Sequence, residues 1–225
     1  MKRALHLYYR LMLNHFGPTG WWPGDSAFEV AVGAILTQNT AWANVEKAIA
    51  NLKHNRLLSP RAILACPKSR LESALRPSGF FRVKSRRLRS FCTFLVDEYG
   101  GSMKRLARRP LDRLREELLE AHGIEPETAD DIILYACEKP VFVVDAYTRR
   151  ILSRHGHVEP EIGYEDLRAL FEIHLERDVA MFKDYHGLIV WTGKEYCRAT
   201  PNCEKCPLAH TLRRGQPLLI QTTAK

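Results

Sequence analysis

The chain has 225 residues, of which 45% are hydrophobic and 27% charged, as in a globular protein with a sizeable core. No apolar run approaches the roughly 20 residues of a membrane-spanning helix, and the first residues have a helical pattern, not that of a signal peptide. We therefore expect no membrane association and a cytoplasmic protein, associated with the nucleoid if bacterial. The formal net charge of +8 favours a polyanionic partner, because each neutralised phosphate releases a counterion.

Helical periodicity runs through nearly the whole chain. Apolar residues recur at turn spacing, which predicts helices around residues 4–12, 28–36, 45–52, 88–95, 111–119, 132–136, 144–154, 164–176 and 179–196. The run Val141–Val144 is β-prone, but no stretch alternates convincingly like a strand. The sequence therefore predicts an all-α protein.

Glycine and proline separate these segments, and there is neither a low-complexity linker nor a long repeat. Any second lobe must therefore be built from chain segments that return to it. Two basic stretches, 82–89 and 104–109, concentrate the positive charge. Each is either a nucleic-acid-binding surface or an ordinary solvated helix face.

Residues 118–133 predict two helices joined by a tight turn. The first helix ends near Ala121, Gly123 permits a left-handed turn, and Pro126 suits the first turn of the second helix. Backbone N–H groups exposed at such a junction suit a DNA phosphate. Because helix–glycine–helix patterns are common, a purely structural turn remains the alternative.

Asp145 closes the apolar run after this hairpin and opens a helix, where a carboxylate is a good N-cap. A hairpin followed by a short apolar run and an aspartate resembles the helix-hairpin-helix DNA glycosylase superfamily of endonuclease III. The resemblance implies that Asp145 is catalytic: it stabilises positive charge developing on the sugar and can activate the attacking water. A role as a helix cap alone is the alternative.

The same resemblance implies a fold and a partner. It implies two helical lobes with the DNA cleft between them. Residues 25–139 would form the six-helix lobe with the hairpin, and residues 1–24 with 140–225 the other lobe with a C-terminal cysteine loop. The expected partner is double-stranded DNA with a damaged base, bound by a monomer.

The hairpin departs from the family pattern at two positions. Bifunctional members carry a lysine at the start of the second helix, where it forms a Schiff base; here that residue is Glu127, followed by Thr128. A carboxylate cannot form the imine, so hydrolytic, monofunctional chemistry is favoured. The second hairpin glycine is Glu125 here, which weakens phosphate binding at that point. Gly123, Glu125, Glu127 and Thr128 are the expected DNA-binding residues of the hairpin.

Several peptides resemble the 3-methyladenine DNA glycosylase III branch of the superfamily, over residues 20–155. They are Trp21-Trp22-Pro23, Leu36–Thr40, Arg76–Phe80 and Tyr135–Cys137. The resemblance implies that Trp22, Pro23 and Trp42 enclose a methylated purine. A purine methylated at N3 or N7 carries positive charge, which attracts it to aromatic faces. Ordinary core or hinge packing is the alternative for these residues.

Three further polar residues are candidates for the site. Gln38 and Asn39 are in the turn that family members push into the gap left by the flipped base, although turn capping explains them nearly as well. His186 precedes Gly187 and is a candidate for the base pocket, or else a core histidine.

Cys197, Cys203 and Cys206 crowd into one short C-terminal segment. Relatives of endonuclease III hold a [4Fe–4S] cluster there with four cysteines, and the fourth position is Leu212 here. Three outcomes stay open: a cluster with three thiolates and a fourth ligand such as His210 or solvent, a zinc site of the cysteines and His210, or free thiols. In each case the expected role is structural.

The sequence thus predicts a monofunctional DNA N-glycosylase that removes alkylated purines resembling 3-methyladenine in base-excision repair. It would act by base flipping and Asp-assisted hydrolysis. The alternatives are a mismatch thymine or uracil glycosylase, an endonuclease III-like glycosylase with AP lyase activity through another lysine, and a non-catalytic DNA-binding protein that retains the fold.

Overall fold

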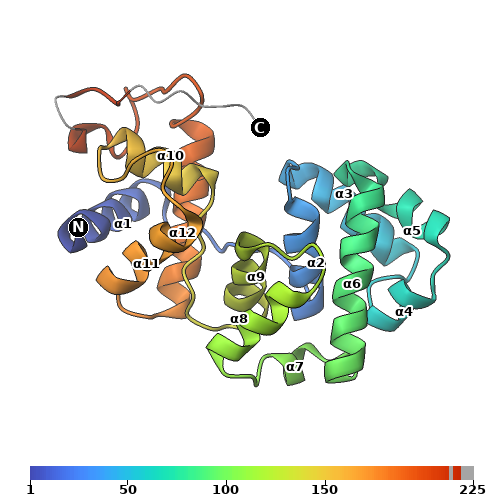
Figure 1. Cartoon of the computed structure of the whole chain (residues 1–225). Coiled ribbons are helices and arrows are strands. Elements are labelled where there is room, and N and C mark those ends of the chain that lie inside the picture. The colour runs from blue at the N-terminus through green and yellow to red at the C-terminus, as the bar shows by residue number, and fades with distance from the viewer. Residues whose placement is uncertain (213–214, 219–225) are drawn as a thin grey trace. The chain divides into compact units, whose positions relative to one another are not determined.

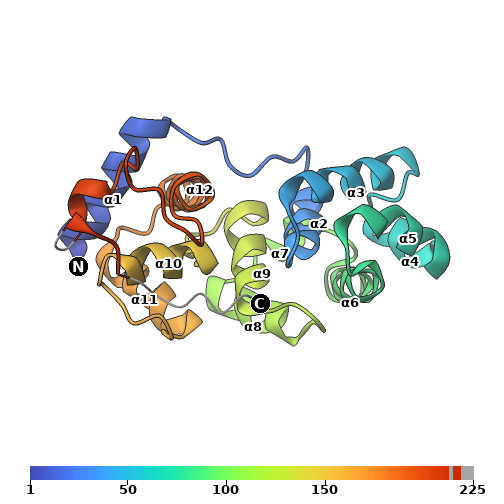
Figure 2. The same cartoon turned by 90° about the horizontal axis from the view of Figure 1, so that it is seen from above.

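The computed structural model describes residues 1–212 and 215–218. Within these ranges the chain is helical and contains no β-strand, which confirms the all-α prediction (Figures 1 and 2). The chain divides into two compact units. We call residues 1–22 with 140–225 the terminal unit and residues 23–139 the hairpin unit. Of the expected C-terminal range, residues 213–214 and 219–225 lie outside the described residues.

The hairpin unit is built around α2. Its helices are α2 (Ala27–Thr37), α3 (Trp42–His54), α4 (Pro60–Ala65), α5 (Lys68–Leu75), α6 (Phe81–Tyr99), α7 (Met103–Leu106), α8 (Leu111–Glu120) and α9 (Pro126–Asp131), with a 3₁₀ turn at Arg76–Ser78 and a π-helical turn at Ile132–Ala136. Nearly every residue of α2 is buried, since an apolar sequence on all sides suits a helix enclosed by others. The long α6 packs against α2, α4 and α5, and α9 packs against both α2 and α8 (Figure 1).

The terminal unit joins the first helix to the last third of the chain. It contains α1 (Lys2–Phe16), α10 (Ala146–Arg154), α11 (Tyr164–His174), α12 (Val179–Glu195) and a 3₁₀ turn at Ala209–Thr211. α12 lies between α1 and α10 and packs against both (Figures 1 and 2). The buried Tyr185 hydroxyl of α12 donates a hydrogen bond of 2.8 Å to the Leu5 carbonyl of α1. A polar group buried this deeply needs such a partner.

The β-prone run Val141–Val144 is buried but forms no strand. Its Phe142 ring stacks on Phe171 with centroids 4.0 Å apart and meets Phe182 edge-on at 5.1 Å. The β-branched and aromatic residues of this run therefore pack in the helical core. The run ends directly before Asp145, at the start of α10.

Candidate functional site

Asp145 is the N-cap of α10. Its Oδ1 atom accepts hydrogen bonds from the backbone N–H of Thr148 at 2.7 Å and from the Thr148 hydroxyl at 2.8 Å. The Asp145 N–H in turn donates to the Thr148 hydroxyl at 3.3 Å, which completes a reciprocal capping box. These contacts occupy Oδ1 and fix the carboxylate plane, so Oδ2 is the oxygen that meets other groups.

His186 is one of those groups. Its Nε2 atom lies 3.8 Å from Oδ2 of Asp145, and both side chains are largely buried. Burial disfavours the Asp145 carboxylate, but His186 and the two donors of Thr148 outweigh burial, so the pKa of Asp145 is lowered. The carboxylate is therefore ionised at neutral pH, as a group that must stabilise positive charge requires.

The loop that carries Trp21 and Trp22 is attached to α12 beside His186. Asp184 Oδ1 accepts hydrogen bonds from the Thr19 backbone N–H at 2.8 Å and from its hydroxyl at 3.0 Å. A Cβ atom at Gly187 would come within 2.8 Å of the Trp21 Cβ. Gly187 thus lets the tryptophan loop approach α12 closely, next to the residue that faces Asp145.

The other two predicted base-pocket residues belong to the hairpin unit. Pro23 is exposed, and Trp42 is half-buried at the first position of α3. The indole N–H of Trp42 donates to Glu46 at 2.8 Å, one helical turn along. This contact orients the ring and leaves part of its surface open.

The predicted hairpin turn is confirmed in its geometry. Gly123 adopts a φ of +83°, and Pro126 begins α9. The guanidinium of Arg115 on α8 holds the fully buried carboxylate of Asp130 on α9 through two hydrogen bonds, at 2.7 and 3.2 Å. Such a bidentate pair fixes the angle between the two hairpin helices. Glu125 and Glu127 are exposed, whereas Thr128 is buried.

Gln38 reaches the hairpin. Its Nε2 atom donates to the Thr128 hydroxyl at 2.8 Å and to the Gly123 carbonyl at 3.3 Å, and its Oε1 accepts from Arg87. The amide of Gln38 thus links the turn to the hairpin, and its contact with DNA stays a prediction. Its neighbour Asn39 is exposed, with a φ of +53°.

Asn39 lines a small surface pocket together with Phe80, Val83 and Arg87. Phe80 is 68% exposed and has a left-handed backbone with a φ of +44°. Large apolar side chains held outward at a strained position commonly mark a contact surface. Phe80 was not expected as a site residue, although the Gly79-Phe80-Phe81 peptide shortly after Pro77 was an available signal.

Below this surface, the turn is held by the buried ammonium of Lys84. Its Nζ atom donates to the Leu36 carbonyl at 2.8 Å, the Ser78 carbonyl at 2.6 Å and the Thr40 hydroxyl at 2.5 Å. Burial, with a smaller effect of Arg87, lowers the pKa of Lys84 to about 8. Lys84 therefore sets the shape of the Gln38–Thr40 turn from within.

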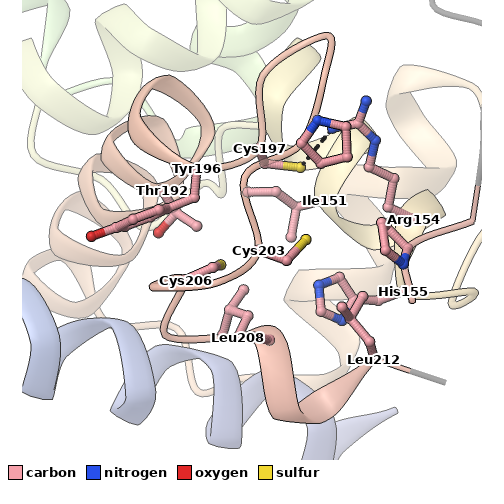
Figure 3. A pocket seen from close by; sticks show the side chains of 13 residues that line it. Ile151, Arg154, His155, Thr192, Tyr196, Cys197, Cys203, Cys206, Leu208 and Leu212 are labelled. Carbon is pink, nitrogen blue, oxygen red and sulfur yellow. Dashed lines mark hydrogen bonds between the residues drawn. The ribbon is translucent and has the colours of Figure 1, made fainter. Parts of the chain in front are cut away.

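The three C-terminal cysteines line one pocket of the terminal unit (Figure 3). Burial raises the pKa of Cys206 to about 11, and the Cys203 and Cys197 thiols add to this rise. Arg154 on α10 donates to the Cys197 sulfur at 3.2 Å and to the carbonyls of Arg198 and Ala199. The arginine thus fixes the loop that carries the three cysteines.

The fourth predicted ligand is not in this pocket. His210 is exposed and does not line it, whereas His155 and Leu212 do (Figure 3). The Thr211 hydroxyl lies 3.1 Å from Nδ1 of His155 and orients the ring. His155 was missed because it is 42 or more residues from the cysteines in sequence, and no local pattern joins them.

The donor set fits a cluster better than a single ion. In the part of the chain that the structure describes, no three His, Cys, Asp or Glu side chains are close enough to bind one metal ion. A zinc ion would draw its sulfur ligands to about 3.8 Å from each other, given Zn–S bonds of about 2.3 Å. The thiolates of a [4Fe–4S] cluster bind different irons and stand farther apart. Three thiols around one pocket are a donor set of the kind that an iron–sulfur cluster takes.

Searching the described helices for one long and apolar enough to cross a bilayer identifies none. Comparison with known proteins shows the family to which the chain belongs. The model of the HhH-GPD superfamily of base excision DNA repair proteins matches residues 32–176. A Methanocaldococcus jannaschii protein with the provisional name of DNA repair glycosylase is 42% identical, over 91% of this chain and 93% of its own length. Endonuclease III of Thermotoga maritima is 30% identical, over 80% of this chain and 79% of its own length.

Solved structures show the same fold. An endonuclease III trapped on DNA superposes with a TM-score of 0.81 at 24% identity, over 96% of this chain and 97% of that one. The 3-methyladenine DNA glycosylase MagIII of H. pylori, bound to 1,N6-ethenoadenine, has a TM-score of 0.72 at 30% identity, over 86% and 97%. The chain therefore belongs to the HhH-GPD superfamily of base excision DNA repair proteins, and it is a DNA glycosylase.

Proposed function

We propose that this glycosylase removes alkylated purines by hydrolysis, without cutting the strand, and that Asp145 is its catalytic carboxylate. The observation that carries the proposal is the setting of Asp145: Thr148 occupies Oδ1, and Oδ2 faces His186. An ionised, oriented carboxylate stabilises the oxocarbenium-like sugar as the base departs. A cationic base is already a good leaving group, so no strong general acid is required.

For the base, Trp22 and Trp42 each offer an aromatic face, with Pro23 as an apolar neighbour. N3- and N7-methylated purines are cations, and a cation over an indole face gains roughly 0.5–2 kcal/mol. The 30% identity to a glycosylase named for 3-methyladenine supports this substrate class. His186, which faces Asp145, is the fourth residue proposed to bind the base.

Strand cleavage through a Schiff base requires an accessible amine. Glu127 occupies the first turn of α9 and has none. Lys84 has a lowered pKa, the usual mark of a nucleophilic lysine, but its Nζ is enclosed by three oxygen acceptors. Neither Glu127 nor Lys84 thus offers an accessible amine, which supports hydrolysis without a lyase step.

On the DNA side, we propose that the hairpin residues Gly123, Glu125, Glu127 and Thr128 lie at the phosphate backbone. Asn39 and Phe80 are the exposed residues suited to enter the duplex where the base is flipped out, because the Gln38 amide is engaged by the hairpin. Gln38 then acts as a positioning residue for Asn39.

We also propose that Cys197, Cys203 and Cys206 hold a [4Fe–4S] cluster with His155 as the fourth ligand. His155 lines the cysteine pocket, and Thr211 orients its ring from the Nδ1 side, the arrangement that metal-binding histidines generally have. The cluster would be structural, fixing the loop on α10 and α12. Zinc bound by His210 is the less suitable alternative, because His210 is outside the pocket.

A second candidate is an endonuclease III-like glycosylase with AP lyase activity. The 30% identity to the Thermotoga maritima endonuclease III favours it. The two candidates differ in whether the strand is cut and in whether a covalent enzyme–DNA adduct can be trapped by borohydride.

The test uses duplexes that carry 7-methylguanine, 3-methyladenine, 1,N6-ethenoadenine or a G·T mismatch. Release of free base and strand nicking are measured before and after alkali. We expect release of the cationic methylpurines, with nicks only after alkali and no borohydride adduct. Nicking without alkali would contradict hydrolysis alone, and release of mismatched thymine in preference to methylpurines would contradict the substrate class.

The aromatic faces are tested with W22A and W42A, and with W191F as the matched control on α12. Trp191 packs on Phe16 and has no part in the proposal. We expect W22A and W42A to slow release of 7-methylguanine more than release of the neutral 1,N6-ethenoadenine. Equal losses on both substrates would mean that stacking area, not charge, is recognised.

A further inference from the structure

Arg87 of α6 lies directly over the hairpin turn. A Cβ atom at Gly123 would overlap the Cγ of Arg87, so no other residue fits at position 123 beneath this side chain. Position 123 thus needs glycine for two reasons, its positive φ and the arginine above it.

The guanidinium joins two segments that flank the turn. One terminal nitrogen donates to the Oε1 of Gln38, and the other donates to Glu125 Oε1 at 3.3 Å. Gln38 in turn donates to the Gly123 carbonyl and to Thr128. The cation is therefore held at the centre of a network of turn and hairpin residues.

Glu125 is the residue that replaces the second glycine of the hairpin, and its charge matters for a surface that meets DNA. Its side chain is 66% exposed and that of Arg87 is 24% exposed. A partly exposed ion pair of this kind contributes little to stability, typically about 0–1 kcal/mol. Arginine binds a phosphate through two parallel hydrogen bonds, which is a stronger contact. A phosphate can therefore replace the carboxylate as partner of Arg87.

We propose that Arg87 binds a phosphate of the DNA backbone beside the hairpin, and that Glu125 occupies the guanidinium in the free protein. DNA binding exchanges one anion for the other, while Gln38 keeps the arginine in place. Glu125 then lowers the affinity for any duplex, damaged or not. The proposal rests on membership of the DNA glycosylase superfamily and is independent of which base is excised.

The test measures the Kd for an undamaged duplex by fluorescence anisotropy at several salt concentrations. The variants are R87M and R87Q, which lose the charge, R87K, which keeps the charge but loses the fork, and E125Q. K68M on α5 is the matched control, since Lys68 is 72% exposed and its only described ion pair is with Glu72 at 3.8 Å. Thermal melts establish that each variant is folded.

We expect R87M and R87Q to weaken binding and to reduce the slope of log Kd against log salt by about 0.9, the value for one phosphate contact. R87K should keep the slope, because its ammonium still releases a counterion. E125Q should bind undamaged DNA several-fold more tightly, and K68M should leave the slope unchanged.

A purely structural role of Arg87 predicts different changes in Kd and in its salt dependence. R87K and R87M would then weaken binding alike, since both lose the guanidinium fork, and neither would change the slope; that result would overturn the proposal. Weaker binding by E125Q would contradict the exchange of anions. All of these binding measurements use undamaged DNA. A negative result for Arg87 would therefore say nothing about base excision, and a negative result for base excision would say nothing about Arg87.

Discussion

The Nε2 atom of His186 lies 3.8 Å from Oδ2 of Asp145, while both Thr148 donors bind the opposite oxygen of the same carboxylate. The two oxygens of Asp145 thus have separate tasks. Oδ1 caps α10, and Oδ2 faces the side of α12 on which Gly187 admits the tryptophan loop. A capping role and a catalytic role are therefore compatible in one residue.

The first prediction concerns the pH dependence of stability. The folded pKa of Asp145 is below its ordinary value of about 3.9, so ionised Asp145 contributes stability above that value and loses it as pH falls through the folded pKa. In D145N the Asn side chain still caps the helix, because asparagine is as good an N-cap as aspartate. We expect the unfolding free energy of wild type minus that of D145N to rise from pH 3 to pH 5 and then level off. A difference that is flat over this range would contradict the lowered pKa.

The second prediction assigns His186 a positioning role. Nε2 of His186 faces Oδ2 of Asp145 at 3.8 Å, and leucine would replace this polar atom with an apolar surface, so H186L should slow single-turnover base release on the order of 10-fold. H186Q places an amide nitrogen near the position of Nε2 and should recover part of the rate.

Groups that act as a unit are non-additive, so H186L should have little further effect in the D145N background. KM should change less than kcat. A rate loss in H186L that multiplies fully with that of D145N would show that His186 acts independently of Asp145.

The third prediction concerns the pair that fixes the hairpin. D130N removes the buried carboxylate that accepts two hydrogen bonds from the Arg115 guanidinium, and we expect a loss of about 3–5 kcal/mol in urea unfolding. The control is R113M on the same helix, which breaks the exposed pair with Glu116. Its unfolding midpoint should be nearly unchanged. Equal effects of the two variants would contradict a special role for the buried pair.

The fourth prediction concerns the cysteine pocket. Protein prepared without oxygen should contain iron and acid-labile sulfide in equal amounts and absorb broadly in the visible range. C203S and H155A should lose most of both, and H210A should keep them. Zinc without iron, or loss of iron in H210A but not in H155A, would contradict the proposed ligands.

Local features of the fold could be predicted from the sequence. The hairpin turn depends on Gly123, which has a positive φ, and on Pro126 at the start of the next helix. The cap of α10 depends on Asp145, the residue immediately before that helix. Each is decided by residues a few positions apart. The fold class likewise follows from periodicity that continues along the chain.

Contacts between distant segments could not be predicted in this way. Arg87 and Gln38 are 49 residues apart, and Lys84 and Leu36 are 48 apart. These groups, which include the backbone carbonyl of Leu36, meet because α6 packs against α2. The position of Gln38 in the turn was visible in the sequence, whereas its hairpin partners Gly123 and Thr128 were not. His155 and the three C-terminal cysteines also line one pocket although they are far apart in the sequence, so this contact could not be predicted either.

The role of Asp145 is tested most directly by comparing single-turnover release of 7-methylguanine by wild type and by D145N, with the DNA affinity of both measured alongside. We expect D145N to bind the duplex as wild type does and to release the base on the order of 10²- to 10³-fold more slowly, as when one preorganised electrostatic group is lost. Base release by D145N at the wild-type rate would show that Asp145 does not drive the cleavage.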